Sequence, residues 1–496
     1  MTTIADLIAA SAALHDLSDN ELDHRLHEHV AILRKLITTK ALDQIAQDET
    51  LFDYFDPSRD SVTYLLLLRL RLQILRETTG RAVPVDLLPG GRLWLRAAYF
   101  LDAFDRAQVC FAGQEFRYLI ELVAEASQTV SKPILSVLLI RNALLRLDPS
   151  CAMLTSIHLL LIRLCLHAKA YTCALPVLDQ NISHLPIPNK RPTPKSTSKD
   201  GTGNGSNSPL VSEIPGISAN ISSMDYLRYF LYGGMVYMAL KEWRKASHFL
   251  GIVISMPTAG SISMIMIEAY KKWVLVGLLQ KGQLPPPPKI TSSQVVKAYQ
   301  SLAKPYVSLA QAFESGDVKR FDAEVDAARE TWSNDNNMGL VSQLQRAFTT
   351  HAVMRIKSTF SALTLAELAQ QAPSLPQNEN ATESAVASLI MSGAIHATLV
   401  HPPRHTGPTM LRFPTTSGSS SLSRELSMQT QFRGEKQTLE KLMNSLRQSN
   451  HSLGLSDEVV DSMQKNQEWA AAGDTGSGMG EQPTAEMEED IMGELS

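Results

Sequence analysis

Three histidines near the start of the chain, His24, His27 and His29, are the first residues to test for chemistry. A helical zinc-peptidase site needs two histidines four residues apart, with a glutamate directly after the first, and this spacing is absent. The His27-x-His29 pair could begin a metal-dependent isopeptidase site if serine and aspartate followed at set distances, but Ile37 and Lys40 occupy those positions. We therefore predict an exposed helix here, without a metal.

The four cysteines, Cys110, Cys151, Cys165 and Cys173, are the next candidates. No two form a Cys-x-x-Cys pair, and no histidine cluster lies beside them at the spacing of zinc ligands. We expect reduced, buried thiols, as in proteins of the nucleus and cytoplasm. Cys165 and His167 are two apart in a predicted helix, so they face different sides and cannot pair as nucleophile and base.

The motifs of other enzyme classes are also missing from the sequence. It contains neither the glycine-rich loops that hold phosphates nor the Gly-x-Ser-x-Gly turn of serine hydrolases. We therefore expect no catalytic, cofactor-binding or metal-binding residue, and a protein that is not an enzyme.

The composition favours helices over strands. The 496 residues are 44% hydrophobic but only 6% aromatic, which suits Leu/Ala-rich helices better than a β-rich fold. The net charge of −4 gives no sign of a polyanion binder. The N-terminal residues lack the basic stretch of a signal peptide, and the longest uncharged run, 246–267, is broken at 256–260 by a turn. We expect no membrane segment.

The first 185 residues are expected to be N-terminal helical repeats. Apolar spacing predicts helices at 62–76, 92–109, 116–128, 133–147, 152–168 and 171–181. Residues 186–222 are rich in Pro, Ser, Gly and Asn, which predicts a disordered insertion. Four consecutive prolines at 285–288 predict a short polyproline II spacer.

Helices resume over residues 223–372. The stretch 224–257 predicts a tetratricopeptide-like hairpin, in which small residues of the first helix let the second pack closely. Gly233 and Gly234 would each cost roughly 1 kcal/mol of helix stability if they had no packing role. Close packing against the second helix is therefore the better interpretation.

Residues 373–414 are predicted to complete a small α+β winged helix. Helices are expected at 360–371 and 379–395, with a capping box between Thr364 and Glu367, and strands at 396–401 and 409–413 around a loop at 401–410. Some winged helices place their second helix on DNA, but residues 381–400 contain no Lys or Arg, which disfavours nucleic-acid binding.

A C-terminal helix is predicted at 423–449, after a Ser-rich hinge at 415–423. It carries an apolar stripe made of Phe432, Leu439, Leu442 and Leu446, together with Met443. Such a stripe on a lone helix predicts a partner. The acidic, Gly-rich residues 470–496 predict a disordered tail.

The helical array followed by a winged helix resembles the PCI domain of the proteasome lid, the constitutive photomorphogenesis 9 signalosome and a translation initiation factor. Four runs narrow the resemblance to the family of third subunits of the signalosome, with the likeness strongest to fungal members. These runs lie at 154–179, 232–243, 268–282 and 335–341. The fold class expected is thus an all-α helical-repeat superhelix, a winged-helix module and a C-terminal helix.

The resemblance implies a non-catalytic scaffold, partnered by other PCI-domain subunits and by the isopeptidase subunits of a complex that removes a ubiquitin-like modifier from cullins. It implies indirect contact with cullin–RING ligases, and location in the nucleus and cytoplasm. A lid subunit of the proteasome and a nucleic-acid-binding module are the alternatives.

The resemblance also implies two subunit interfaces. One is the winged-helix edge, with Ile395, Ala397, Leu399, Leu411 and Phe413. The other is a bundle of C-terminal helices, to which this chain would contribute Phe432, Leu439, Leu442 and Leu446.

Overall fold

The computed structural model describes residues 4–13, 19–38, 49–80, 82–151, 153–180, 182, 216–257, 262–372, 374–376, 378–401, 408–413 and 421–454. The chain divides into two compact units, Met1–Pro414 and Thr415–Ser496. The predicted tail at 470–496, the hinge at 415–420, and residues 186–215 of the predicted insertion lie outside the described residues. Over the described residues, no helix combines the length and the apolarity that a membrane crossing requires.

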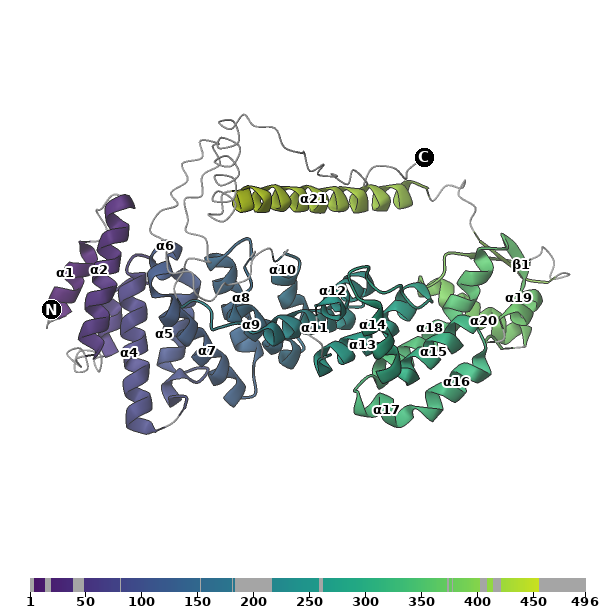
Figure 1. Ribbon diagram of the computed structural model, residues 1–496, viewed down its shortest axis with the longest axis horizontal. Coiled ribbons are helices and arrows are strands. Elements are labelled where there is room, and N and C mark those ends of the chain that lie inside the picture. Colours follow the sequence, from purple (N-terminus) through teal and green to yellow (C-terminus); the bar gives the residue numbers. More distant parts are fainter. Residues whose placement is uncertain are drawn as a thin grey trace, which may run out of the picture. The chain divides into compact units, whose positions relative to one another are not determined.

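The first unit is a succession of helices that pack on their neighbours in chain order (Figure 1). Its N-terminal part consists of α1 Ile4–Ala12, α2 Asp19–Thr38, η1 Glu49–Tyr54, α4 Ser61–Thr79, η2 Val85–Leu87, α5 Arg92–Ala103, α6 Arg106–Val109, η3 Cys110–Ala112, α7 Gly113–Thr129, α8 Ile134–Leu147, α9 Ser156–Ala168, η4 Tyr171–Ala174 and α10 Leu175–Leu178. Its second part consists of α11 Ser223–Ala239, α12 Trp243–Ser255, α13 Met264–Lys281, α14 Ser293–Leu302, α15 Lys304–Ser315, α16 Val318–Ala327, α17 Arg329–Asn334 and α18 Met338–Lys357.

Helix α4 is central to the N-terminal part because its first two turns are buried on every side. All residues from Ser61 to Leu68 are buried, which explains the uninterrupted apolar run in the sequence. The helix ends at Gly80, whose φ of 64° is a left-handed conformation that glycine adopts without strain.

The structure splits the single helix that was predicted at 92–109. Helix α5 ends at Ala103, and Asp105 then caps α6 by accepting a hydrogen bond from the backbone nitrogen of Ala107 at 3.2 Å. An Asp at this place favours a new helix start over continuation, because its carboxylate satisfies a backbone donor that the helix leaves unpaired.

The predicted close packing of the 224–257 hairpin is present between α11 and α12. A β-carbon at Gly233 would lie 2.7 Å from the Phe249 ring, and one at Gly234 would lie 3.0 Å from Leu250. These glycines therefore allow the two helices to approach more closely than any larger residue would.

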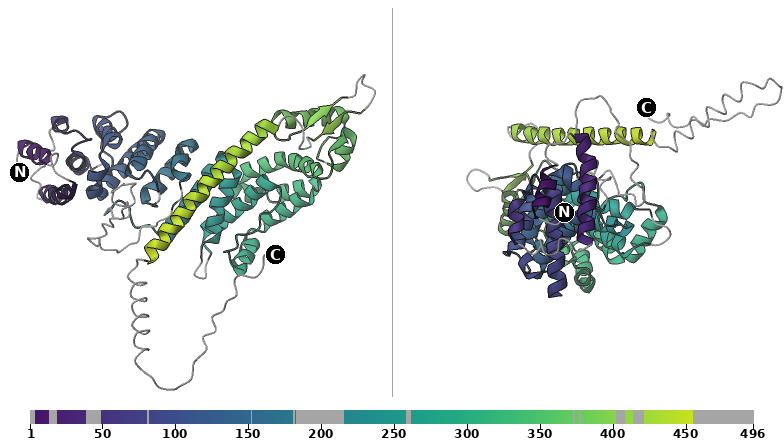
Figure 2. Two further views of the ribbon diagram at one scale, coloured as in Figure 1. Left: turned by 90° about the horizontal axis from the view of Figure 1, so that it is seen from above. Right: turned by 90° about the vertical axis from the view of Figure 1, so that its left-hand side faces the viewer.

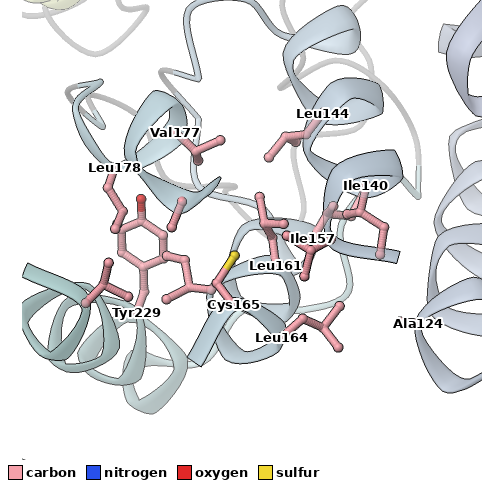
Figure 3. Packing of buried hydrophobic residues seen from close by; sticks show 14 of the residues in the cluster. Ala124, Ile140, Leu144, Ile157, Leu161, Leu164, Cys165, Val177, Leu178 and Tyr229 are labelled. Atoms are coloured by element: carbon pink, nitrogen blue, oxygen red, sulfur yellow. The ribbon is translucent and has the colours of Figure 1, made fainter. Parts of the chain in front are cut away.

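The core between α8 and α11 surrounds Cys165 (Figure 3). Leu161 and Cys165 of α9 are buried beside Leu178 of α10, and the ring of Tyr229 from α11 lies against this group. All four cysteines remain thiols; three are buried and Cys173 is half-buried. One continuous core of this kind runs through the array from Leu7 to Phe348.

The prediction of a disordered insertion is wrong for its last seven residues. Ile217 is only 2% exposed, and the Ser218 hydroxyl accepts a hydrogen bond from the Ser156 backbone nitrogen at 3.0 Å. Ser222 then caps α11 in a reciprocal capping box with Asp225. Ordering a segment costs conformational entropy, and the composition of this one suggests that little offsets that cost. The buried Ile217 side chain and these polar contacts provide the offset.

The first unit ends in a small winged-helix module with its own core. After α18 come β1 Ala362–Thr364, α19 Leu365–Gln371, α20 Glu379–Met391, β2 Thr398–Val400 and β3 Met410–Arg412. The strands form an antiparallel sheet in the order β1-β3-β2, with Leu363 and Leu399 both opposite Leu411. Helix α18 links the two cores, because Phe348 belongs to the first and Val353 to the second.

Strand β1 corrects the prediction that 360–371 is one helix. Ala362–Thr364 is extended and pairs with β3, and the helix begins only at Leu365. The capping box predicted between Thr364 and Glu367 is present at that start. The second unit contributes α21 Ser421–Gly454, a single unbroken helix (Figure 2) that extends beyond the predicted 423–449 at both ends.

Candidate assembly interface

The three N-terminal histidines lie in two different environments. His24 and His27 are exposed as predicted, but His29 is buried, and its Nε2 lies 2.9 Å from the Thr63 hydroxyl. Burial lowers the pKa of His29, although the nearby Asp60 carboxylate opposes this shift. Within the described ranges, no three His, Cys, Asp or Glu side chains come together as metal ligands.

Cys151, His158 and Asp148 form a small buried cluster that has the residue types of a nucleophilic site but not its electrostatics. Burial, with a smaller contribution from Asp148, raises the pKa of the Cys151 thiol to about 12. Burial also lowers the pKa of His158 to about 4. An activated cysteine needs a lowered pKa, so this thiol would stay protonated at neutral pH. His158 instead caps α9, with its Nδ1 3.2 Å from the Thr155 backbone nitrogen.

A buried carboxylate joins three helices of the N-terminal repeats. Glu115 of α7 accepts hydrogen bonds from Arg34 of α2, at 2.9 and 3.0 Å, and from Arg69 of α4, at 2.8 Å. Burial alone would raise the pKa of Glu115, but the two guanidinium groups hold it below its usual value. A cavity of about 490 Å³ is lined by these three residues and by eight others, among them Gln73 and Ile74. Both arginines donate to Glu115, so the three residues hold α2, α4 and α7 against one another.

A second polar joint, which we call the inner tie, crosses α13, α15 and the end of α17. Lys271 donates to both carboxylate oxygens of Asp335 at 2.8 Å, and the Tyr306 hydroxyl donates to the same carboxylate at 2.7 Å. Asn337, which is 1% exposed, donates to the Tyr306 hydroxyl at 2.7 Å. Asn336 lies between Asp335 and Asn337, just beyond the end of α17, and has a left-handed φ of 55°. Asn tolerates this conformation better than most residues do.

A third joint repeats the same three residue types, and we call it the outer tie. The Asp179 carboxylate at the end of α10 accepts from the Tyr237 hydroxyl at 2.7 Å and from Lys245 at 2.8 Å. The lysine ammonium also lies over the tyrosine ring, 5.3 Å from its centroid, as Lys271 lies over Tyr306 at 5.7 Å. Sequence reasoning singled out neither tie.

The winged-helix residues predicted to contact a partner face the inside of the module. Ile395, Ala397, Leu411 and Phe413 are at most 9% exposed, and Leu399 packs half-buried against them. Successive residues of a strand point to opposite faces, so these alternate positions form the module's own core. These side chains therefore offer little surface of their own to another chain, and the predicted contact at the winged-helix edge stays a prediction.

The outward face of the same sheet has exposed residues at the alternate positions. Val400 and Met410 are directly opposite each other across β2 and β3 and are 46% and 40% exposed. Strand β3 is central, so its backbone is paired on both sides, whereas β2 and β1 are the two edges of the sheet. An edge contact through this module would use the backbone of β2 or β1, with side chains such as Val400 and Met410 beside it.

Helix α21 exposes the apolar stripe that the sequence predicts. Phe432, Leu439, Leu442 and Leu446 are between 47% and 65% exposed, and Met443 is 44% exposed. On a helix these positions lie within one face, since they recur at spacings of three, four and seven residues. The stripe is therefore exposed on α21, the described part of the second unit, and can offer a binding surface.

The order of helical repeats, winged helix and C-terminal helix defines the chain as a PCI-domain protein. The family model for the PCI domain matches residues 323–405, which include α18 and the winged-helix module as far as β2. The model for the N-terminal helical repeats of COP9 signalosome complex subunit 3 matches residues 19–200 and 205–296. The predicted start of the PCI domain at residue 223 lies inside this second match.

Similar proteins narrow the class to one family. COP9 signalosome complex subunit 3 of Emericella nidulans is 37% identical in an alignment of 503 positions that covers 99% of each chain. The proteins of the same description from Dictyostelium discoideum and Arabidopsis thaliana are 29% and 25% identical, over 59% and 70% of this chain and 62% and 70% of theirs. The chain belongs to the COP9 signalosome complex subunit 3 family, which confirms the resemblance.

The two ties connect the four runs on which that resemblance rests. The outer tie joins Asp179, in the run at 154–179, to Tyr237, in the run at 232–243. The inner tie joins Lys271, in the run at 268–282, to Asp335, in the run at 335–341. These runs therefore supply, at least in part, the polar contacts that fix neighbouring helices against one another.

Proposed function

We propose that this chain is a non-catalytic scaffold subunit of the signalosome, the complex that removes a ubiquitin-like modifier from cullins and so regulates cullin–RING ubiquitin ligases. Its partners would be the other PCI-domain subunits and the isopeptidase subunits, with cullin–RING ligases contacted indirectly. Membership of the subunit 3 family supports this proposal. The raised pKa of the Cys151 thiol is consistent with a role outside catalysis.

The observation that carries the proposal is the exposed stripe of α21. Five large apolar side chains lie on one face of α21, and all five are exposed. Burying a Leu or Phe side chain contributes about 1.5 to 3 kcal/mol, so a partner helix would gain substantially from covering this face. Helices with one apolar face associate into bundles through such stripes.

The stripe can be tested with a paired set of variants in the tagged full-length chain. Leu442→Asp with Leu446→Asp places two charges on the apolar face. Gln437→Asp with Asn444→Asp places the same two charges on the opposite, exposed face. We expect the first pair to lose the other signalosome subunits in affinity purification with mass spectrometry, and the second pair to retain them. Equal recovery from both pairs would remove the stripe as a contact.

The same purification tests the identity of the complex. Recovery of signalosome PCI-domain and isopeptidase subunits would support the proposal, and recovery of proteasome-lid subunits in their place would overturn it. Deneddylation by the purified single chain would contradict a non-catalytic role.

The outward face of the sheet in the winged-helix module gives a second, independent test. Val400→Asp with Met410→Asp should weaken contact with a neighbouring PCI-domain subunit while leaving the module folded, because both side chains are exposed. Leu411→Asp should instead unfold the module, since Leu411 is fully buried. The proposal also locates the protein in the nucleus and the cytoplasm, which fluorescence microscopy of the tagged chain would test.

A further inference from the structure

The link between α13 and α14 contains four consecutive prolines, and residues 284–291 form what we call the proline strap. It is held at both ends. The Leu284 backbone nitrogen donates to Glu314 at 2.5 Å, and the Thr291 hydroxyl donates to Ser255 at 3.3 Å. The spacer that the sequence predicts at 285–288 is thus tied to neighbouring helices at both ends.

Two of the prolines lie against glycines of the helices beneath. A β-carbon at Gly277 of α13 would come within 2.2 Å of the Pro285 ring, so glycine is required for this close approach. Pro288 lies 3.9 Å from the equivalent point on Gly251 of α12. Pro285 and Pro288 are half-buried, whereas Pro286 and Pro287 are exposed.

This exposure pattern has the period of a polyproline II helix. That helix has three residues per turn, so residues i and i+3 face the same side. Pro285 and Pro288 form the inward side and leave Pro286 and Pro287 on the outward sides. A turn then follows, closed by the Thr291 backbone nitrogen donating to the Pro288 carbonyl at 2.9 Å. Its tip presents the exposed Lys289 and Ile290, the latter 81% exposed.

We propose that residues 286–290 are a binding site for a proline-recognition domain, one whose groove is lined by aromatic side chains and carries an acidic residue for Lys289. Such domains bind polyproline II segments, because a preformed extended helix loses little entropy on binding. Here the inner prolines hold the segment in place, and the outer prolines, with Ile290, provide an apolar ridge beside a cation. The inner pair alone would suffice to cover Gly277 and Gly251.

The test measures binding of the full-length chain to a panel of purified SH3, WW and EVH1 domains by isothermal titration calorimetry. The informative variant is Pro286→Ala with Pro287→Ala, which leaves both anchoring prolines in place. Its matched control is Pro149→Ala, an exposed proline in the turn between α8 and α9. We expect binding to at least one domain class, weakened at least tenfold by the double variant and unchanged by the control.

A second variant, Lys289→Glu, tests the charge at the turn tip and should also weaken binding, whether or not the double proline variant folds fully. Failure of every domain to bind the full-length chain, while a synthetic peptide of residues 282–291 binds, would overturn the proposal. Equal binding by the wild type and both variants would overturn it as well. The proposal does not rest on membership of the signalosome, so its failure would leave the proposed function intact.

Discussion

The inner and outer ties use the same three residue types but differ in how far they are removed from water. The Lys271 and Asp335 side chains are 18% and 23% exposed, whereas those of Lys245 and Asp179 are 47% and 42% exposed. The inner tie also includes the buried Asn337, and the Tyr306 ring packs edge-on against Trp332 at 4.7 Å. Identical chemistry should thus contribute different stability, because water screens the outer tie and competes for its hydrogen bonds.

The largest effect is expected from Asp335→Ala. It removes the carboxylate that Lys271 and Tyr306 share, leaving both partly buried polar groups without it, and should cost about 3 kcal/mol of unfolding free energy. Urea denaturation followed by tryptophan fluorescence would measure this loss. Asp335→Asn keeps an acceptor for Tyr306 and should lose less. A loss below that of Asp179→Ala would contradict the comparison.

Acid should weaken the part of the array that carries the outer tie. His158 lies beside Tyr229 of α11, the helix that also bears Tyr237, and its pKa in the folded protein is about 4, mainly because of burial. The unfolded chain would take up this proton first, near pH 6.5. The stability is therefore complete above pH 6.5 and is lost as the pH falls towards 4, by up to about 3 kcal/mol.

The variant that tests this acid effect is His158→Asn, which keeps an acceptor near the position of Nδ1. Its unfolding free energy should change less between pH 7 and pH 4 than that of the wild type. Parallel curves for the two proteins would assign the acid sensitivity to other groups.

Close packing, more than the outer tie, should hold α11 against α12. Gly233→Ala would push a methyl group into Phe249 and should cost about 2 kcal/mol through overpacking. The matched control is Gly434→Ala in α21, where nothing lies within 4 Å of the added carbon. That change should raise helix stability by about 1 kcal/mol, measurable by circular dichroism. Changes in stability of opposite sign would show that Gly233 is needed for packing and that Gly434 is not.

The smallest effect is expected from Asp179→Ala. It breaks the outer tie at an exposed position and should cost less than about 1 kcal/mol. The loss should shrink further in 1 M salt, because exposed charges are screened there. Thermal unfolding at low and high salt would measure both values, and a salt-independent loss as large as that of Asp335→Ala would show that burial does not separate the ties.

Most of the fold could be predicted from local pattern. The apolar spacing that predicted α4, α7 and α8 survives because each helix packs mainly on its neighbours in chain order. Strand β1 was not predicted because its three residues, Ala-Leu-Thr, are too short a run to indicate a strand. Pairing with β3 holds them extended. The burial of Ile217 was not predicted for a similar reason. One apolar residue does not change a prediction of disorder that rests on the composition of the whole segment.

The candidate interfaces divide in the same way. The stripe on α21 depends on helical periodicity alone and was predicted residue by residue. For the winged-helix module, the prediction had to decide which face of a strand is exposed. Ile395, Ala397 and Leu399 alternate along the chain, and this alternation marks the face that the module buries. The hydrogen bonds of the ties join residues 29 to 66 positions apart in sequence, so no local pattern could reveal them.

The inner tie also sets an order of events during synthesis. Lys271 can meet Asp335 only after the chain has grown by a further 64 residues, up to Asp335 itself, which takes about 3 to 13 s at the usual elongation rates. Until then α13 has its apolar contacts with α12 but lacks its ionic partner. A nascent chain that stalls before Asp335 would therefore present Lys271 and α13 incompletely covered to the chaperones at the tunnel exit.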